Sequence, residues 1–342
     1  MLGRARGLLR QGAYAVGALG LRHHRRNAAT LTVAMFHRVV APGSPAAIGA
    51  DPNYSLSAPL FAACLDAIRR HYAVIGLPDL LAALGDGPPL PPRAMLLTFD
   101  DGWRDNMDVA APILARAGLP AVLFAATDAI TDSAPRWWQE VLLRALRDGR
   151  AGFDPLWSAA GGGPPPDTAA IPPELHLLLR YGALAPAERV ALLAPLETPG
   201  MAAEGRHMLD AAGLDAIAAA GFAIGAHGAT HLPLSMLADP GADLARARAA
   251  LAAMRPGVPV ETLSFPHGRY HEGVLRAARA AEFRVLFTSD ACLNAAPGGR
   301  PGTLLGRINI VAAAITDATG ALDPARLATW LFNRPITRLA EA

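Results

Sequence analysis

Short apolar runs alternate along most of the chain with segments in which apolar residues recur at helical spacing. The runs predict strands, and the segments between them predict helices. This order is typical of parallel β/α units, and about seven strands before the C-terminal segment favour a barrel over an open sheet. The predicted strands are residues 31–36, 73–77, 94–98, 121–125, 222–225, 262–265 and 284–288. Helices are predicted at residues 79–84, 105–117, 208–220, 242–254 and 272–281.

The alternation of strands and helices stops in residues 131–206, which we predict to be a helical insertion that caps the barrel mouth. Trp137 and Trp138 lie in this insertion. Two hypotheses remain open for them: their rings stack on sugar rings of a substrate, or they pack in the core. The insertion has helical patterns at residues 137–148, 174–181 and 187–196 and a Gly/Pro-rich linker at residues 161–166.

Residues 1–29 form a separate basic segment at the N-terminus. Six arginines and no acidic residue occur in residues 1–26. The apolar stretch 11–21 is short and runs into five basic residues without a cleavage site of small residues, which argues against a secretory signal. We expect a basic arm that either lies on an anionic membrane surface or stays solvated. The expected location is the cytoplasm, peripheral to the inner membrane.

The chain has 342 residues, of which 52% are hydrophobic. Its composition excludes several classes of chemistry. The sequence contains no lysine, so a Schiff-base lysine or a phosphate-loop lysine is excluded. Residues after the arm include 25 arginines and 29 acidic residues, so their net charge is about −4. A body of this charge is a poor nucleic-acid binder. The two cysteines do not predict a disulfide-built scaffold.

The strongest chemical signal is a pair of carboxylates, Asp100 and Asp101, directly after a predicted buried strand. Parallel β/α proteins place their active sites at the carboxyl ends of strands. Adjacent carboxylates repel each other, so one commonly holds a cation while the other acts as a base. For this segment alone, a strand that simply ends at an Asp-Gly turn remains an alternative.

Two further signals follow later strands. His227 and His231 are spaced so that both imidazoles can bind one divalent ion, and an aspartate completes the two-His, one-carboxylate set of a catalytic zinc site. Pro266 and His267 form a turn whose backbone N–H groups can face a developing oxyanion, although a plain tight turn explains the segment equally well.

These segments, in this order, resemble the motifs of the polysaccharide deacetylase family, the NodB-like carbohydrate esterases. Residues 35–39 look like the opening Tyr-His-Arg-Val strand of exopolysaccharide-associated members. Residues 98–102 match the Thr-Phe-Asp-Asp-Gly signature. Residues 227–231 match the His-[Ser/Thr]-x-x-His signature, with Gly228 in place of the hydroxyl residue. The resemblance covers approximately residues 30–310.

The resemblance implies an α/β fold, a distorted (β/α)7 barrel in a single domain of residues 30–342 that carries the helical insertion 131–206. It implies Asp100 as the catalytic base that takes a proton from a metal-activated water. It also implies a divalent metal ion, with Zn²⁺ as the first choice and Co²⁺ or Ni²⁺ as alternatives, bound by Asp101, His227 and His231.

The sequence departs from the family at two places. The third motif usually has an arginine shortly before its proline, whereas Leu263 and Ser264 stand there. A late Leu-x-His motif usually supplies the general acid, but no histidine follows His271. The candidates for the acid are therefore His37, His267 and a reprotonated Asp100. We favour His37 because the subfamily that the sequence resembles often has a histidine at the end of the first strand; a structural imidazole hydrogen-bonded to a neighbouring loop is the alternative for this residue.

Three hypotheses about function follow. The first is a metal-dependent hydrolase that removes N-acetyl groups from amino sugars of a polysaccharide or of its lipid-linked precursor. The second is a glycan-binding or assembly protein that keeps the barrel without turnover. The third is a C–N hydrolase of non-sugar amides, because the metal site does not name the carrier of the acyl group. The expected partner is an N-acetylated glycan and not a nucleic acid.

Overall fold

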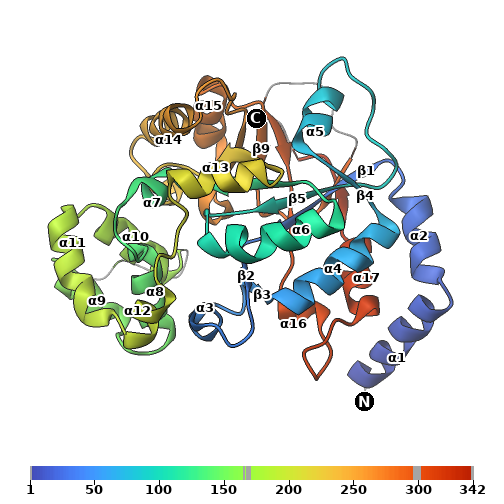
Figure 1. Cartoon of the computed structure of the whole chain (residues 1–342), viewed down its shortest axis with the longest axis horizontal. Helices are drawn as coiled ribbons and strands as arrows, with labels where there is room; N and C mark the ends of the chain where they lie inside the picture. Colours follow the sequence, from blue (N-terminus) through green and yellow to red (C-terminus); the bar gives the residue numbers. More distant parts are fainter. Residues whose placement is uncertain (1, 165, 167–170, 296–301, 340–342) are drawn as a thin grey trace.

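A computed structural model describes residues 2–164, 166, 171–295 and 302–339 of the chain (Figure 1). Seven parallel strands form the central sheet in the order β11-β9-β8-β7-β6-β5-β1. The other strands of this sheet pair with β1, β5 or β10, and a second, two-stranded sheet joins β2 and β3. The strands are β1 Thr30–Phe36, β2 Arg38–Val40, β3 Ser55–Ser57, β4 Ala73–Ile75, β5 Ala94–Phe99, β6 Ala121–Ala125, β7 Phe222–Ala226, β8 Thr262–Ser264, β9 Val285–Phe287, β10 Leu293–Ala295, β11 Thr303–Leu305, β12 Ile308–Asn309 and β13 Ile336–Thr337.

One stretch of chain links the two ends of the seven-stranded row. β11 pairs with β9 at one end, and β12, which begins after Gly306 and Arg307, pairs with β1 at the other end. Residues 303–309 therefore run from one edge of the row to the other, while no pairing among the described strands joins β11 to β1. The prediction of an α/β fold of the distorted (β/α)7 barrel type is confirmed.

Alternate residues of the strands enter two different cores. In β1 and β5, Leu31, Val33 and Leu96 belong to an inner cluster with side chains of other strands. Ala34 and Leu97, one residue further along, belong to an outer cluster that includes side chains of α4, α6, α13, α14 and α15. Because both faces of these parallel strands are buried, their sequences are continuous apolar runs without polar alternation.

The helices occupy the positions between the strands, and two differ from the prediction in an instructive way. The helix predicted from residue 208 begins at Ala211, because the Asp210 side chain caps it and Met208 forms a bridge with Trp103. The helix predicted over 105–117 is a π-helix over its first turn. The helices near the barrel are α3 Pro45–Gly49, α4 Ala58–His71, α5 Leu77–Ala83, the π-helix Asn106–Ala110, α6 Ala111–Ala117, α7 Thr127–Thr131, α13 Ala211–Ala219, α14 Pro240–Met254, α15 Glu272–Ala280, α16 Ala312–Ile315 and α17 Pro324–Phe332.

The described part of residues 131–206 consists of helices and loops without a strand. These helices gather at one end of the molecule in Figure 1 and share their own apolar cluster, in which Leu142, Leu178 and Tyr181 are fully buried. We call this region the cap. Its helices are α8 Trp138–Arg147, α9 Phe153–Ala159, α10 Pro173–Gly182, α11 Pro186–Leu193 and α12 Pro199–Glu204, with a 3₁₀ turn at Ala194–Leu196.

The basic N-terminal segment forms two helices, α1 Leu2–Ala15 and α2 Ala18–Arg26, that lie along one side of the molecule beside α17 (Figure 1). The His23 ring of α2 is buried and stacks on Phe332 with ring centroids 3.9 Å apart. Arg26 donates hydrogen bonds to the carbonyl oxygens of Phe332 and Arg334. The arm is therefore fastened to the body at α2. Among the described residues, no helix combines the length and apolarity needed to cross a membrane.

Candidate active site and metal centre

The chemically active residues meet at the carboxyl ends of the parallel strands. Asp100 and Asp101 follow β5, His227 follows β7, and His37 follows β1. Arg307 arrives on the segment between β11 and β12 that links the barrel edges. Parallel strands end on the same side of a sheet, which is why segments distant in sequence converge here.

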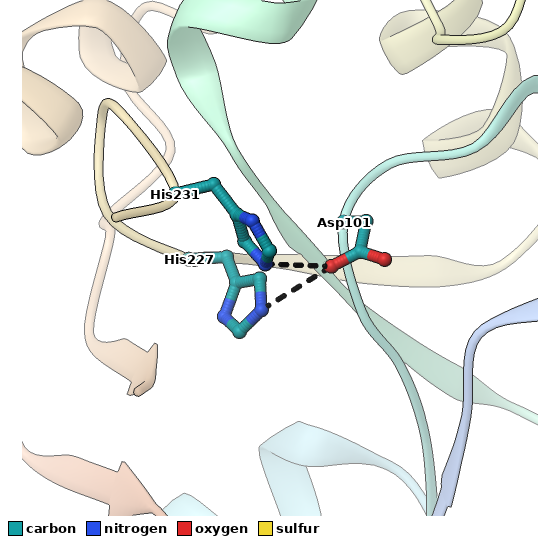
Figure 2. Close-up of side chains that lie close together, drawn as sticks. All are labelled: Asp101, His227 and His231. Atoms are coloured by element: carbon teal, nitrogen blue, oxygen red, sulfur yellow. Dashed lines mark ion pairs between the residues drawn. The ribbon is translucent and has the colours of Figure 1, made fainter. Parts of the chain in front are cut away.

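Asp101, His227 and His231 form a candidate metal centre (Figure 2). The Asp101 Oδ1 atom lies 3.1 Å from His231 Nε2 and 3.4 Å from His227 Nε2. Two ligand atoms at about 2.0–2.1 Å from a tetrahedral zinc ion are roughly 3.3–3.4 Å apart. The three buried donors thus have the spacing and the chemical types that a divalent transition-metal ion requires.

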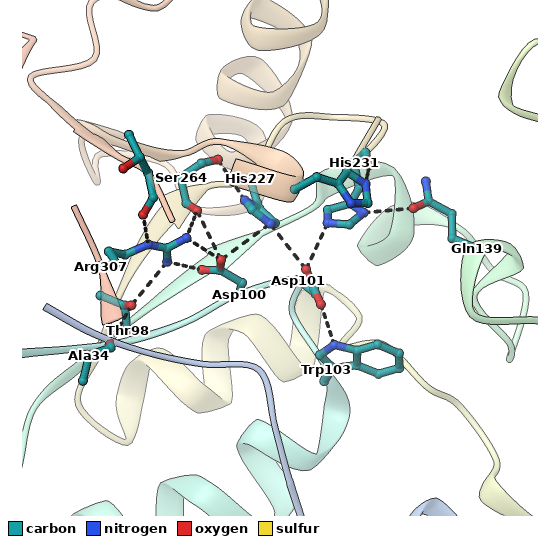
Figure 3. A network of polar contacts seen from close by, with 12 residues as sticks. Ala34, Thr98, Asp100, Asp101, Trp103, Gln139, His227, His231, Ser264 and Arg307 are labelled. Carbon is teal, nitrogen blue, oxygen red and sulfur yellow. Dashed lines mark hydrogen bonds and ion pairs between the residues drawn. The ribbon is translucent and has the colours of Figure 1, made fainter. Parts of the chain in front are cut away.

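Each of the three ligands is oriented by a hydrogen bond on its far side (Figure 3). His227 Nδ1 donates to the Ser264 carbonyl oxygen at 2.8 Å, and His231 Nδ1 donates to Gln139 Oε1 at 2.9 Å. The Trp103 indole N–H donates to Asp101 Oδ2 at 2.8 Å. These bonds leave both Nε2 atoms and Asp101 Oδ1 free to face one point, as supporting partners of metal ligands do.

The backbone at the site adopts a conformation that L-residues rarely use. Asp101, His231 and His267 have φ values of 77°, 55° and 57°. A non-glycine residue in this region costs of order 1–3 kcal/mol, and such residues cluster at functional sites. Gly228 also has a positive φ, and a Cβ there would lie 2.9 Å from Asp243 Oδ1. This close approach explains why glycine replaces the hydroxyl residue of the family signature.

Asp100 does not join the metal ligands but forms a buried ion pair with Arg307 (Figure 3). Arg307 Nη1 donates to Asp100 Oδ1 and Nη2 donates to Oδ2, both at 2.7 Å. Nη2 also donates to Ser264 Oγ at 2.7 Å. Burial is the largest single influence on the pKa of Asp100 and favours the neutral carboxyl. The charge and hydrogen bonds of Arg307, together with the charges of His227 and His37, outweigh burial and lower the pKa of Asp100. Asp100 is therefore an ionised carboxylate beside the metal centre.

Three residues of the site, Arg307, Trp103 and Gln139, belong to none of the sequence motifs. Arg307 is separated from Asp100 by 207 positions and lies in a short apolar run that was not recognised as a strand. One signal was available: the third motif lacks its usual arginine, and Ser264, which stands near that place, now accepts a hydrogen bond from Arg307. No local signal pointed to Gln139 in the cap.

His37 and His267 both lie at the site, in different environments. The His37 ring packs edge-on against Tyr54, and its Nδ1 atom is buried with no hydrogen-bond partner among the described residues. Burial lowers the pKa of His37. His267 Nε2 lies 3.2 Å from the His231 carbonyl oxygen, and burial lowers the pKa of His267 to about 3.

A cavity of about 650 Å³ opens in front of these residues, between the barrel mouth and the cap. Trp137 contributes to its wall and packs edge-on against Trp103 and His231. Trp138 does not line the cavity: its ring lies in the cap, beneath the guanidinium of Arg189. Pro266 is buried and does not line the cavity. The barrel side of the cavity carries His37, Asp100, Asp101, His227, His231 and Arg307, and the cap side carries Leu143, Leu146, Leu175 and Leu178.

The model of the polysaccharide deacetylase family matches residues 87–152 and 199–286. The matched segments include both aspartates and both metal-centre histidines, and the unmatched residues between them lie inside the cap. The matched residues make up a polysaccharide deacetylase domain of the NodB type. The matched family is one of hydrolases that deacetylate polysaccharides, and the first hypothesis is confirmed at this coarser level. None of the curated proteins matches the sequence.

Several solved structures share the fold. The deacetylase PplD of Streptococcus pyogenes, solved in complex with acetate, has a TM-score of 0.55 and 14% identity over 89% of this chain and 99% of its own. IcaB from Ammonifex degensii has a TM-score of 0.55 and 17% identity over 88% and 97%. A de-N-acetylase from Aggregatibacter actinomycetemcomitans has a TM-score of 0.51 and 15% identity over 81% and 93%.

Proposed function

We propose that this chain removes N-acetyl groups from amino sugars of an exopolysaccharide or of its lipid-linked precursor, using a divalent metal ion bound by Asp101, His227 and His231. The observation that carries the proposal is the convergence of these three ligand atoms next to a second, separately held carboxylate, Asp100. The cavity volume of about 650 Å³ lies within the roughly 300–1,000 Å³ typical of small-molecule sites, so it can hold one or two sugar units.

The donor set supports zinc as the first choice of metal. Two imidazole nitrogens and one carboxylate oxygen suit Zn²⁺, and Co²⁺ and Ni²⁺ accept the same donors. When bound, such an ion polarises an acyl oxygen and lowers the pKa of a water molecule. The protein's contribution is the fixed direction of the ligands, maintained by Trp103 and Gln139 and by the Ser264 carbonyl.

Asp100 acts as the general base in this proposal. Its Oδ2 atom lies 3.8 Å from His227 Nε2, so the carboxylate borders the position from which an activated water would attack the acyl carbon. Arg307 keeps the carboxylate ionised at neutral pH and prevents its rotation through two parallel hydrogen bonds. A carboxylate has about four acceptor sites. Arg307 uses one on each oxygen and the Ser264 hydroxyl uses a second on Oδ2 at 3.3 Å, so Oδ1 retains one for the incoming proton.

His37 acts as the general acid that protonates the departing amine. The amine cannot leave the tetrahedral intermediate without a proton, and His37 lines the cavity with a buried Nδ1 atom that has no protein partner among the described residues. The Nε2 atom of His267, by contrast, contacts the His231 carbonyl oxygen. We therefore assign His267, with the turn after β8, to the wall that surrounds the developing oxyanion.

Acetate release tests the metal dependence and the base together. The purified chain is stripped of metal with a chelator and incubated with oligomeric N-acetylglucosamine, with or without Zn²⁺, Co²⁺ or Ni²⁺. We expect acetate only after metal is added, and Asp100→Asn should lower turnover by about 10²–10⁴-fold while retaining metal. Asp128→Asn, which changes a half-exposed carboxylate on α7, is the matched control. Metal-independent acetate release, or glycan binding without turnover in the presence of all three metals, would contradict the proposal.

A further inference from the structure

The outer face of the N-terminal arm exposes an unusual number of large apolar side chains. Of the nine large apolar residues that the described part of the chain exposes strongly, four lie in this arm. Leu8 and Leu9 are each 75% exposed, Val16 is 80% exposed and Leu21 is 54% exposed. Single exposed apolar residues are ordinary on protein surfaces, whereas a cluster on one short segment indicates an interaction surface.

The contacts of the arm determine which face points outward. On α1, Gln11 Nε2 donates to Asp323 Oδ2 at 2.8 Å, and Tyr14 packs against the main apolar cluster. A helix turns by about 100° per residue, which places Leu9 on the side of α1 opposite Tyr14. The buried His23 anchors α2 in the same way. The apolar residues therefore face away from the body because polar and aromatic contacts hold the other face.

Positive charge lies in the same arm. Arg10 pairs with Asp323 of the body and Arg26 donates hydrogen bonds to carbonyl oxygens of the body, while other arginines stay exposed. The first acidic residue of the chain is Asp51, while six arginines precede residue 27. Arg22 and Arg25 are exposed on α2 beside Leu21. A helix that combines exposed leucines with arginines and lacks acidic groups is typical of segments that lie in the interface of a membrane with anionic lipids.

We propose that the arm docks the protein onto an anionic lipid bilayer. Leu8, Leu9 and Val16 enter the boundary between headgroups and acyl chains, and Arg22 and Arg25 pair with lipid phosphates. The charge distribution favours a lipid bilayer over a second copy of the chain as the partner of the arm. A two-fold contact through the arm would bring like-charged arginines together. The proposal does not depend on the catalytic assignment, because its readout is binding and not turnover.

Co-sedimentation of the full chain with lipid vesicles tests the proposal. One set of vesicles is phosphatidylcholine alone, and the other contains phosphatidylglycerol as well. We expect binding to the anionic vesicles that falls as salt is raised, and at least roughly tenfold weaker binding to the neutral vesicles. Equal binding to both sets, or no binding to either, would overturn the proposal.

Paired variants separate the apolar contribution from the charge. Leu8→Ser with Leu9→Ser should weaken binding by about tenfold or more, since each buried methylene group contributes to insertion. Arg22→Gln with Arg25→Gln should weaken it by roughly tenfold at low salt. The matched controls are Val190→Ser, which changes an apolar side chain that is 61% exposed on the cap, and Arg116→Gln with Arg276→Gln on other helices. Both controls should bind like the parent chain.

Two measurements separate a lost docking surface from a lost fold and from a lost dimer. Circular dichroism of each variant checks that the helices are retained, so that weaker binding reflects the lost surface. Light scattering without lipid measures the mass in solution. If the parent chain forms a dimer that Leu8→Ser with Leu9→Ser dissociates, the arm is an interface between copies and the membrane proposal is overturned. A lipid-binding defect in variants of unchanged mass supports it.

Discussion

The barrel mouth and the cap border the same cavity, but they are built and held differently. Every candidate metal ligand comes from the barrel, within two residues of a strand end or from the loop that follows it. The described part of the cap contributes no candidate metal ligand. Gln139 accepts a hydrogen bond from His231 and donates one to the Thr230 carbonyl oxygen. Trp137 and other cap side chains line the cavity. The cap has its own apolar core, and part of it lies outside the segments that the family model matches.

This difference indicates a division of labour. Strand ends in a buried barrel are rigid, so they suit ligands whose positions must be accurate to a fraction of an ångström. Helices joined by loops can change in length and sequence without disturbing those ligands. We infer that the barrel carries the chemistry and that the cap shapes the space for the substrate. Four predictions test this comparison, beginning with the largest expected effect.

The largest effect is expected when a barrel ligand is removed. His227→Ala should abolish stoichiometric metal binding and reduce activity by more than the 10–100-fold typical of a lost supporting partner. Gln139→Leu, in the cap, should lower activity by about 10–100-fold and should still bind metal when the metal concentration is high. Elemental analysis and metal titration measure both. Equal metal content in His227→Ala and the parent chain would remove His227 from the site.

The second prediction concerns the acid. His37→Ala should lower kcat/KM by about 10²–10⁴-fold, because positioned acids contribute this much. The acid must be protonated to act, so activity falls as pH rises through the pKa of His37. Burial lowers this pKa, so the descending limb should lie below the ordinary histidine range, and it should disappear in the variant. Metal content should not change. A pH profile that keeps its descending limb in His37→Ala would assign the acid to another group.

The third prediction concerns the partner of the base. Arg307→Lys keeps the positive charge but loses the two parallel hydrogen bonds to Asp100, so the pKa of Asp100 should rise. The base must be ionised to act, and the ascending limb of the pH–rate profile should therefore move to higher pH. Activity at neutral pH should fall by about tenfold. A rate that drops equally at every pH would indicate a purely structural role for Arg307.

The smallest effect is expected from substitutions of two neighbouring tryptophans of the cap. Trp137→Ala should raise KM severalfold, because this ring walls the cavity. Trp138→Ala should leave KM unchanged and lower the free energy of unfolding by about 1–3 kcal/mol, because its ring packs within the cap. Steady-state kinetics and denaturant titration distinguish them. The same effect in both variants would contradict the placement of the two rings.

Local sequence determined the strands and the motifs that follow them. The strands of the central row are buried on both faces, so they appear as apolar runs, and Asp100, Asp101 and His227 follow directly after such runs. The pair His227 and His231 was predictable from its close spacing in sequence, and the structure holds both residues on the loop after β7, not on a helix. These features depend on neighbours along the chain, and the sequence carries them without reference to distant segments.

Tertiary structure alone decided which distant groups complete the site. Arg307 reaches Asp100 only because β11 and β12 pair with opposite ends of the strand row, and Gln139 reaches His231 only because the cap folds back over the barrel mouth. The two tryptophans of the cap are adjacent in sequence, yet one faces the cavity and the other does not. The outward direction of the apolar face of the arm likewise depends on contacts with α17. Contacts between segments separated by one or two hundred residues leave no local periodicity or spacing, and they are decided by the packing of the whole fold.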